Sequence, residues 1–254
     1  MARVFLDAGH GGGDPGALGN GLREKDINLS VTLKVGNILK NHGVDVRYSR
    51  TTDVFVELAD RAARANNVGA DVFVSIHCNA FSDPSARGVE TYSYPGSSSG
   101  ARLSQAIQNS IIASGVYTVN RGTKTANFAV LRLTNMPATL VELAFITNSQ
   151  DANILRNRQD DLAIAVSKGI LNNLGIPYRG GGTTLYKVQV GAFSIRSNAD
   201  NLANEFRGIG YSPIVITSGG LYKVQVGAFS IRANADALVN ELKSKGYDAI
   251  VVIG

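Results

Sequence analysis

Cysteine is nearly missing from this chain, since Cys78 is the only one among 254 residues. A single cysteine excludes an intrachain disulfide, so side-chain packing, with or without a bound metal, must hold the fold together. The sequence also lacks a long apolar run, and we therefore predict no membrane span. Its first residues, MARVFLDAGH, lack the apolar core of a secretory signal, so we expect no recognisable signal peptide.

Strong charge of either sign is missing as well. Lys and Arg number 25 against 20 Asp and Glu, a net charge of +5. This mild and dispersed excess favours only weak attraction to polyanions, and we do not expect nucleic acid as a partner. What is present is the composition of a folded protein, with 44% apolar and 18% charged residues and length enough for one large and one smaller core.

Residues 1–177 alternate short apolar runs with longer stretches of helical period. This pattern is typical of an α/β domain with a mostly parallel, twisted sheet and helices on both faces. We predict its strands at residues 3–7, 44–48, 71–77, 89–93, 128–131 and 139–145. Pro177 and the glycines that follow then mark a boundary, and we place a Gly-rich linker at 178–184.

The rest of the chain, residues 185–254, is a duplication. The string LYKVQVGAFSIR begins at Leu185 and again at Leu221, and 22 of the 34 positions that can be paired are identical. Each repeat, 185–220 and 221–254, reads as strand, helix, strand. Because each unit can bury only one face, we expect the two to form one small βαββαβ domain of the ferredoxin-like kind.

Two of the three histidines stand where predicted strands end, which is where ligands collect in open α/β sheets. His10 precedes three glycines that let backbone approach a site closely, and a packed core histidine needs no such run. His77 closes an apolar run typical of a strand buried on both faces, with Cys78 directed to the opposite side. Either histidine alone could be a satisfied structural residue. His42 is interpreted as a helix C-terminal residue.

Two imidazoles suit zinc, which in catalytic sites commonly takes two histidines, one carboxylate and a water. Glu24, in the loop before the first predicted helix, is well placed to be the carboxylate. Asp26 fits the same position, and either residue could instead be a helix-start carboxylate favoured by the helix dipole. The residues by themselves do not choose between the two.

A further carboxylate, Glu142, lies within the apolar strand ATLVELAF. Burial there would raise its pKa toward the range useful for a general base. Alternation along the strand also permits the opposite interpretation, in which Glu142 faces solvent from a half-exposed strand.

Several stretches together resemble one family, the zinc-dependent N-acetylmuramoyl-L-alanine amidases that free stem peptides from peptidoglycan glycan. The resemblance covers about residues 3–175 and is carried by LDAGHGGGDPGA, REKDINL, SRTTDVFVELADRAARAN, SIHCNA and RGTKTANFAVLRLTNMPATLVELAFITN. It implies Zn²⁺ bound by His10, Glu24 and His77, with Glu142 as the catalytic glutamate. It thereby favours Glu24 over Asp26. Arg23 and Asn79 are candidate substrate contacts.

The duplicated tail resembles the SPOR (sporulation-related repeat) domain, which implies binding to peptidoglycan, particularly glycan stripped of its peptides. The whole arrangement is similar to the amidases that lyse the mother cell of spore-forming bacilli. It implies a cell-wall or extracellular place of action, with cytoplasmic accumulation before release as an alternative. We expect a monomer, with wall teichoic acid as a second partner through the positive charge.

The tail should bind glycan through the open face of its sheet. Alternation along KVQVGAF puts Gln189 and Phe193 of the first repeat, with Gln225 and Phe229 of the second, on the uncovered side. The alternative is an ordinary solvated sheet face. We also expect an enzyme that needs no activator, because the stretch from Val89 to Arg121 has room for one helix and no inhibitory segment.

Two other classes of function compete with the hydrolase. One is a wall-binding protein whose first domain is catalytically silent. The presence of all four predicted site residues argues against it. The other is RNA binding, because RNA-recognition domains share the βαββαβ topology. Those domains stack bases on paired aromatics, whereas KVQVGAF offers Lys, Gln and Gly before a single Phe.

Overall fold

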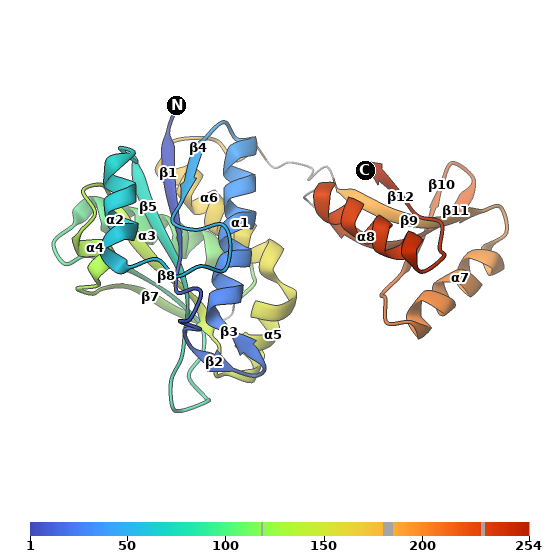
Figure 1. Ribbon diagram of the computed structural model, residues 1–254, viewed down its shortest axis with the longest axis horizontal. Coiled ribbons are helices and arrows are strands. Elements are labelled where there is room, and N and C mark those ends of the chain that lie inside the picture. Colours follow the sequence, from blue (N-terminus) through green and yellow to red (C-terminus); the bar gives the residue numbers. More distant parts are fainter. Residues whose placement is uncertain (118, 180–184, 230–231, 254) are drawn as a thin grey trace. The chain divides into compact units, whose positions relative to one another are not determined.

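Figure 1 shows the computed structural model, which describes residues 1–117, 119–179, 185–229 and 232–253. The chain divides into two compact units, Met1–Tyr178 and Arg179–Gly254. Most of the predicted linker at 178–184 falls outside the described residues.

The first unit is built on a six-stranded sheet in the order β4-β1-β5-β8-β6-β7. Neighbouring strands run parallel except β6 and β8, which confirms a mostly parallel sheet. A short hairpin, β2 and β3, precedes the first helix. The strands are β1 (Arg3–Ala8), β2 (Leu18–Gly19), β3 (Leu22–Arg23), β4 (Asp45–Tyr48), β5 (Val72–Asn79), β6 (Val89–Ser93), β7 (Asn120–Thr125) and β8 (Ala138–Phe145).

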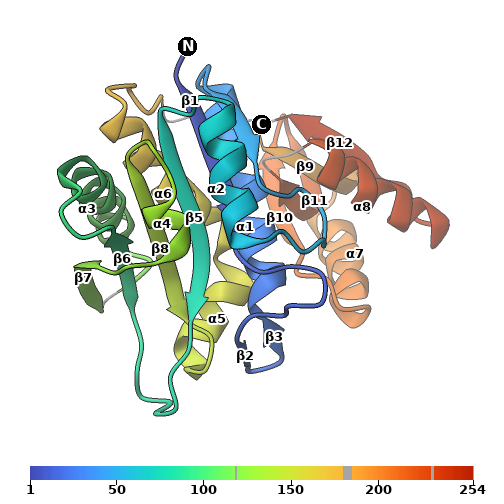
Figure 2. The ribbon, with the colours of Figure 1, turned by 60° about the vertical axis from the view of Figure 1, so that its left-hand side comes forward.

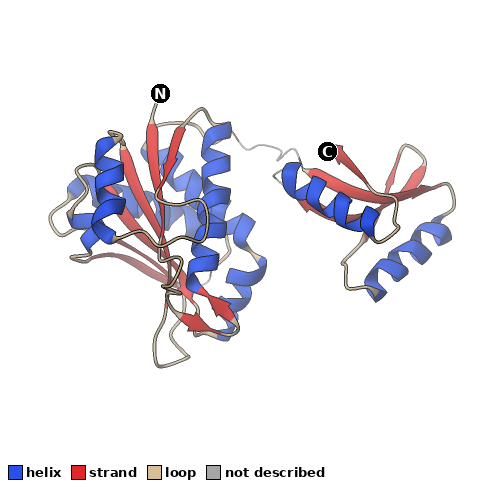
Figure 3. Ribbon diagram, in the orientation of Figure 1, coloured by secondary structure: helices blue, strands red, loops and turns tan. Residues whose placement is uncertain are grey.

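Helices cover both faces of this sheet, as Figure 3 shows. Alternation in β5 explains why, because Val74 and Ile76 belong to the apolar cluster under α1, α3 and α6, whereas Phe73 belongs to the cluster under α2 and α4. Figure 2 shows α2 and α4 together on the near side of the sheet. The helices are α1 (Glu24–Asn41), α2 (Leu58–Asn67), α3 (Ser98–Ala113), α4 (Ala129–Arg132), α5 (Ser149–Asn157) and α6 (Gln159–Asn173).

One predicted strand is wrong. Residues 128–131 form the N-cap and first turn of α4, and the strand of this region is β7, which precedes it. A four-residue apolar run such as FAVL does not distinguish a buried strand from a buried helical turn. The sequence of β7, NRGTKT, has no apolar alternation because it forms a largely exposed sheet edge.

The second unit is a βαββαβ domain, as predicted, with an antiparallel sheet in the order β10-β11-β9-β12. The two copies of LYKVQVGAF supply the two central strands, so the duplicated sequences lie side by side. The elements are β9 (Tyr186–Phe193), α7 (Arg196–Gly208), β10 (Ile214–Ser218), β11 (Leu221–Phe229), α8 (Arg232–Ser244) and β12 (Ile250–Ile253).

Irregular pairing between β9 and β11 changes which side chains face the helices. Val224 pairs with Gly191 and Gln225 with Gln189, so the register skips Val190. On the other strand Gln225 is followed in register by Gly227, which skips Val226. Each strand thus carries one extra residue, and alternation is reversed beyond it.

The expectation that Phe193 and Phe229 lie on the uncovered face is therefore wrong. Phe193 packs with Leu202 of α7, and Phe229 packs in the apolar cluster that includes Leu238 of α8. Glutamines 189 and 225 precede the irregularity in each strand and pair with each other on the opposite side of the sheet. A bulge cannot be read from alternating hydrophobicity, because it inserts one residue without changing residue type.

Candidate metal centre and catalytic carboxylate

Three predicted ligands meet at one end of the large sheet. His10 follows β1, Glu24 begins α1, and His77 lies near the end of β5. Their candidate ligand atoms all lie within 4.8 Å of one another. Glu24 is the first residue of the helix rather than part of the preceding loop, which corrects its expected place. Asp26 lies outside the cluster and forms an exposed ion pair with Arg23.

The backbone around His10 is shaped for a binding site. His10 itself has a left-handed φ of 60°, which non-glycine residues rarely adopt and which clusters at functional positions. Its Nδ1 lies 2.7 Å from Asp14 Oδ2, and its Nε2 lies 3.2 Å from Glu24 Oε1. Asp14 thereby holds the ring with Nε2 directed toward Glu24, the usual role of a carboxylate behind a metal-ligating histidine.

Two glycines are required by this packing. A Cβ on Gly9 would come within 2.2 Å of the His77 ring. Gly16 has a φ of +64°, and a Cβ there would lie 2.6 Å from Glu24 Oε2. The backbone therefore lies directly against the ligands and leaves no room for side chains at these two positions.

Glu24 is held by hydrogen bonds on both of its carboxylate oxygens. Its Oε1 lies 2.9 Å from His77 Nδ1 and accepts from the backbone N–H of Cys78 and from Asn28 Nδ2, while Oε2 accepts from Ala17 N–H. Burial alone would raise the pKa of Glu24, but the hydrogen bonds and charges of the two histidines outweigh it and hold that pKa well below its usual value.

The histidines respond in the opposite direction. Burial lowers the pKa of His10, but Glu24 and Asp14 more than compensate and raise it to about 9. The pKa of His77 is raised as well, with Glu24 outweighing burial. Without a metal, the carboxylates of Glu24 and Asp14 therefore favour the protonated form of the imidazoles.

The donor set fits zinc. Two imidazoles and one carboxylate converge, which is a common ligand set of a catalytic zinc site. The nearby Cys78 thiol does not join them, because its Sγ lies 3.5 Å from Asn28 Oδ1 within the apolar core. Burial also raises the pKa of this thiol well above its usual range, which disfavours the thiolate that a metal requires.

Glu142 lies beside these ligands on β8, paired in register with His77 of β5 and with Glu90 of β6. Its Oε2 is buried and has no hydrogen-bond partner among the described residues. Burial raises the pKa of Glu142, and the negative charges of Glu24 and Glu90 raise it further. His77 acts in the opposite direction, and the resulting pKa is about 7. An unpartnered carboxylate with this pKa is suited to exchange protons with water or substrate near neutral pH.

The strand bearing Glu142 is not half exposed. Leu140, two residues earlier on the same side, packs in the cluster under α2 and α4. The sheet face is therefore covered up to the row of Glu142, where the ligands lie.

A buried ion pair supports the loop that carries His10. Arg61 of α2 and Asp7 of β1 approach to 2.9 Å, with both side chains almost fully buried. Arg61 also donates to the carbonyl oxygens of Ala8 and His10. It thus ties α2 to the backbone on either side of Gly9.

Sequence reasoning missed a second polar cluster next to Glu142. Glu90 is 2% exposed and contacts Arg121, Lys124, Asn79 and Tyr92. The sequence did contain a signal for it, because Glu90 lies within the predicted strand at 89–93 just as Glu142 lies within the predicted strand at 139–145. Asn79, a candidate substrate contact, donates to Glu90, whereas the other candidate, Arg23, lies in the exposed ion pair with Asp26.

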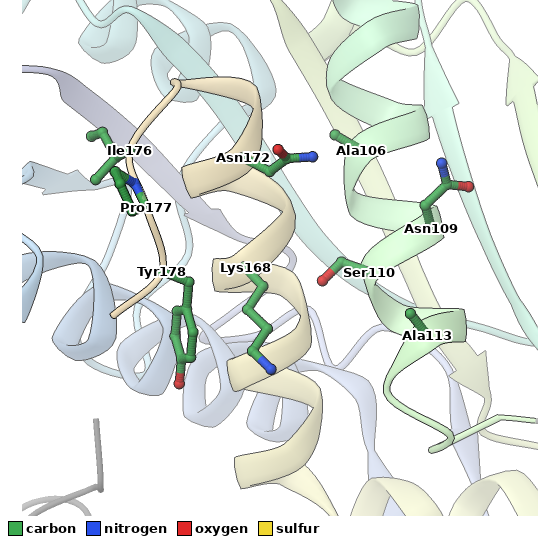
Figure 4. Close-up of a pocket in the computed structure, with 9 residues that line it drawn as sticks. All are labelled: Ala106, Asn109, Ser110, Ala113, Lys168, Asn172, Ile176, Pro177 and Tyr178. Atoms are coloured by element: carbon green, nitrogen blue, oxygen red, sulfur yellow. The ribbon is translucent and has the colours of Figure 1, made fainter. Parts of the chain in front are cut away.

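Another pocket of about 420 Å³ lies between α3 and α6 (Figure 4). Its lining includes Lys168 and Tyr178 but none of the predicted site residues and no carboxylate or histidine. Between residues 89 and 121, excluding 118, α3 is the only helix in the described part of the chain. None of the described helices is long and apolar enough to cross a membrane.

In the second unit, Gln189 and Gln225 are paired neighbours at the centre of the sheet. The register continues to Ile214 of β10 on one side and Ile250 of β12 on the other, and both isoleucines are more than half exposed. Gln225 is only 5% exposed. The two amides thus lie between two exposed aliphatic side chains.

Comparisons with known proteins agree with this division of the chain. A family model for N-acetylmuramoyl-L-alanine amidase matches residues 4–172, and a SPOR domain model matches residues 182–253. The chain is 43% identical over 221 residues to the sporulation-specific N-acetylmuramoyl-L-alanine amidase of Bacillus subtilis, covering 85% of each protein. It is 42% identical over 220 residues to the amidase CwlM of Bacillus licheniformis, again covering 85% of each.

Solved structures share the fold of the first unit. The amidase AmiC2 of Nostoc punctiforme is 41% identical with a TM-score of 0.66, and the match covers 68% of this chain and 97% of that one. The catalytic domain of the amidase CwlV from Bacillus (Paenibacillus) polymyxa is 34% identical with a TM-score of 0.67, covering 70% of this chain and 100% of that one.

Proposed function

The chain belongs to the N-acetylmuramoyl-L-alanine amidase family, and on that premise we propose that it hydrolyses the amide between muramic acid and L-alanine with a zinc ion held by His10, Glu24 and His77. Glu142 acts as the general base. The observation that carries this proposal is the buried, unpartnered Oε2 of Glu142 beside three converging ligands.

When bound, Zn²⁺ would supply a Lewis acid that makes water more acidic and polarises the amide carbonyl. The chain's residues provide the rest. Asp14 and the Ala17 N–H hold the His10 ring and the Glu24 carboxylate, respectively, in the geometry described above. Glu142 takes a proton from water at its free oxygen and returns it to the leaving alanine amine. No serine or cysteine nucleophile is needed.

Purified walls test this proposal. The full chain should expose new alanine amino groups in walls without any added partner. This activity should stop after chelation and recover when zinc is restored. A catalytically silent wall-binding protein would bind walls but expose no new amines. Inactivity until a partner protein is added would contradict independence from an activator.

For the tail we propose binding to glycan stripped of peptides, on the sheet face of Gln189 and Gln225. The SPOR match and the paired central glutamines support it. Side-chain amides donate to and accept from sugar hydroxyls, and the flanking isoleucines offer aliphatic surface. The tail would hold the enzyme beside its own product and raise the local concentration of uncut neighbours.

The biological setting we propose is mother-cell lysis in sporulation, supported by the name of the Bacillus subtilis relative. The enzyme acts at the cell wall as a monomer, with weak attraction to teichoic acid through its net charge of +5. Cells without this protein should complete spores but retain them within unlysed mother cells. Normal release of spores in such a strain would contradict this role.

A further inference from the structure

A second pocket adjoins the catalytic carboxylate and has a basic rim. It has a volume of about 460 Å³ and is lined by Asn79, Phe81, Ala86, Glu90, Tyr92, Arg121, Lys124 and Phe145. Its buried carboxylate, Glu90, pairs in register with Glu142, so the pocket begins one strand away from the proposed base. Nothing in the proposed hydrolysis uses Arg121 or Lys124.

Glu90 cannot serve as a second base, because both of its oxygens are occupied. Asn79 Nδ2 and Tyr92 OH donate to Oε1, at 2.7 and 2.8 Å. Arg121 Nε and Lys124 Nζ donate to Oε2, at 2.7 and 2.5 Å. Burial alone would raise the pKa of Glu90, but these donors outweigh it and keep that pKa below its usual value. Glu90 therefore acts as a fixed anion that positions two cations.

Arg121 and Lys124 can still bind a further anion. Their side chains are 34% and 38% exposed, and two positive charges face one carboxylate. Among the described residues Arg121 uses only Nε in hydrogen bonds, which leaves both terminal nitrogens of its guanidinium for another acceptor. Its guanidinium carbon lies 4.7 Å from the centre of the Phe145 ring, and this contact restricts its orientation. Such an arrangement suits a carboxylate, which a guanidinium can bind through two parallel hydrogen bonds.

The order of strands, taken with the proposed mechanism, indicates which part of the substrate would reach this pocket. Across the sheet, the ligand-bearing strands β1 and β5 come first, then β8 with Glu142, then β6 and β7 with the basic pocket. In the proposed mechanism the carbonyl lies at the metal ligands and the leaving amine lies at Glu142. The peptide therefore continues beyond Glu142, toward β6 and β7. Neighbouring strands are about 4.8 Å apart and one extended residue spans about 3.5 Å, so the residue after alanine lies over the pocket.

Resting on the proposed hydrolysis, we propose that Arg121 and Lys124 bind the free carboxylate of the stem-peptide residue that follows alanine. In peptidoglycan this residue is a glutamate joined through its side-chain carboxyl, and its α-carboxyl is either free or amidated. Arg121 donates to it from its terminal nitrogens, while Lys124 adds charge. The pocket thus selects the free acid over the amide, because the amide is neutral and offers one acceptor oxygen, whereas the carboxylate offers two to the guanidinium.

Two matched substrates test this inference: uncross-linked glycan strands polymerised from lipid-linked precursors with either the free carboxylate or the amide at that residue. The zinc-loaded full chain should cleave the acid form with a kcat/KM about tenfold higher, mainly through KM. The substitutions Arg121→Gln and Lys124→Gln should each reduce this preference, and together bring it near one, with unchanged zinc content. Arg121→Lys, which keeps the charge but not the fork, should retain part of it.

The control is Lys168→Gln, which removes one positive charge from the pocket of Figure 4 and should leave the preference intact. Equal cleavage of both strands by the unmodified chain would overturn the inference while leaving the hydrolase assignment in place. An undiminished preference in a folded, zinc-loaded Arg121→Gln variant would overturn it too. Failure to cleave either strand would instead count against the proposed hydrolysis, and the inference would fall with it.

Discussion

Asp14 Oδ2 lies 2.7 Å from Nδ1 of His10, and this contact determines which ring nitrogen faces Glu24. Asp14 reaches the ring from the turn that the glycine run permits, through a backbone bridge between Gly11 and Asp14. A carboxylate in this position fixes the orientation of a metal-ligating imidazole and increases its basicity.

We therefore predict that Asp14→Ala weakens zinc binding about 10- to 100-fold, although Asp14 is not itself a predicted ligand. The measurement is zinc affinity by competition with a chelator of known strength. The matched control is Asp26→Ala, which removes a nearby exposed carboxylate outside the cluster and should leave the affinity unchanged. Equal affinities for the Asp14 and Asp26 variants would show that the contact does not orient the ring.

Glu142→Gln should separate metal binding from hydrolysis. The amide keeps the size of the side chain but cannot accept a proton, so we expect activity on walls to fall about 10²- to 10⁴-fold with normal zinc content. Glu57→Gln, a change at an exposed N-cap, serves as the control. His10→Ala and His77→Ala should instead lower zinc content and activity together. Near-normal turnover in a zinc-loaded Glu142→Gln enzyme would remove Glu142 from the mechanism.

The metal-free protein should release protons when it binds zinc. In that state the pKa of His10 is raised from 6.5 to about 9 by Glu24 and Asp14, against the effect of burial. The ionised contacts of His10 with these two carboxylates therefore add to the free energy of unfolding of the metal-free protein. This contribution is fully present below pH 6.5 and is lost as pH rises through about 9. Zinc needs the neutral ring, so its apparent affinity should rise with pH up to about 9.

Calorimetry in two buffers with different ionisation enthalpies measures this proton release directly. At pH 7.5 we expect at least one proton released for each zinc bound, and fewer as pH approaches 10. Buffer-independent heats at pH 7.5 would show that His10 is already neutral in the metal-free protein.

Much of the fold was predictable because alternation and helical period report directly on burial. The apolar runs at 71–77 and 139–145 predicted the central strands β5 and β8, and the repeat predicted the βαββαβ unit. The exposed edge strand β7 gave no such signal, and it supplies Arg121 and Lys124. This is why the basic pocket could not be anticipated.

The candidate site, too, was predictable from the sequence only in part. Strand ends and glycines were enough to single out His10 and His77, but only the resemblance favoured Glu24 over Asp26. The structure shows what spacing could not: Glu24 begins a helix whose first turn points back to β5, while Asp26 faces Arg23. The bulge that turns Phe193 toward α7 is likewise a property of strand pairing, which one strand's sequence does not contain.

The correction at Phe193 and Phe229 sharpens what the tail can use to bind glycan. The register places on the face away from the helices the lysines, glutamines and alanines of β9 and β11 with Leu221, and aliphatic residues of β10 and β12 with Ser218. Among the described residues on this face, none is aromatic. Stacking on aromatic rings, the usual mode of RNA-recognition sheets, is therefore not offered by this face. The polar side chains that the central strands of this face offer to sugar hydroxyls are the glutamines, which donate and accept, and the lysines, which only donate.

We predict that Gln189→Ala combined with Gln225→Ala reduces the affinity of the full chain for peptide-free glycan at least tenfold. A reduction of this size corresponds to the loss of about two hydrogen bonds. Each variant also carries Glu142→Gln, so that the walls are not digested during the measurement. The matched control is Asn204→Ala with Asn240→Ala, the equivalent exposed pair on α7 and α8, which removes two amides from the opposite side of the domain. Co-sedimentation with walls stripped of peptides gives the affinities. If both double variants bind as well as the parent, the sheet face is not the site; if only the helix pair weakens binding, the glycan lies against the helices instead.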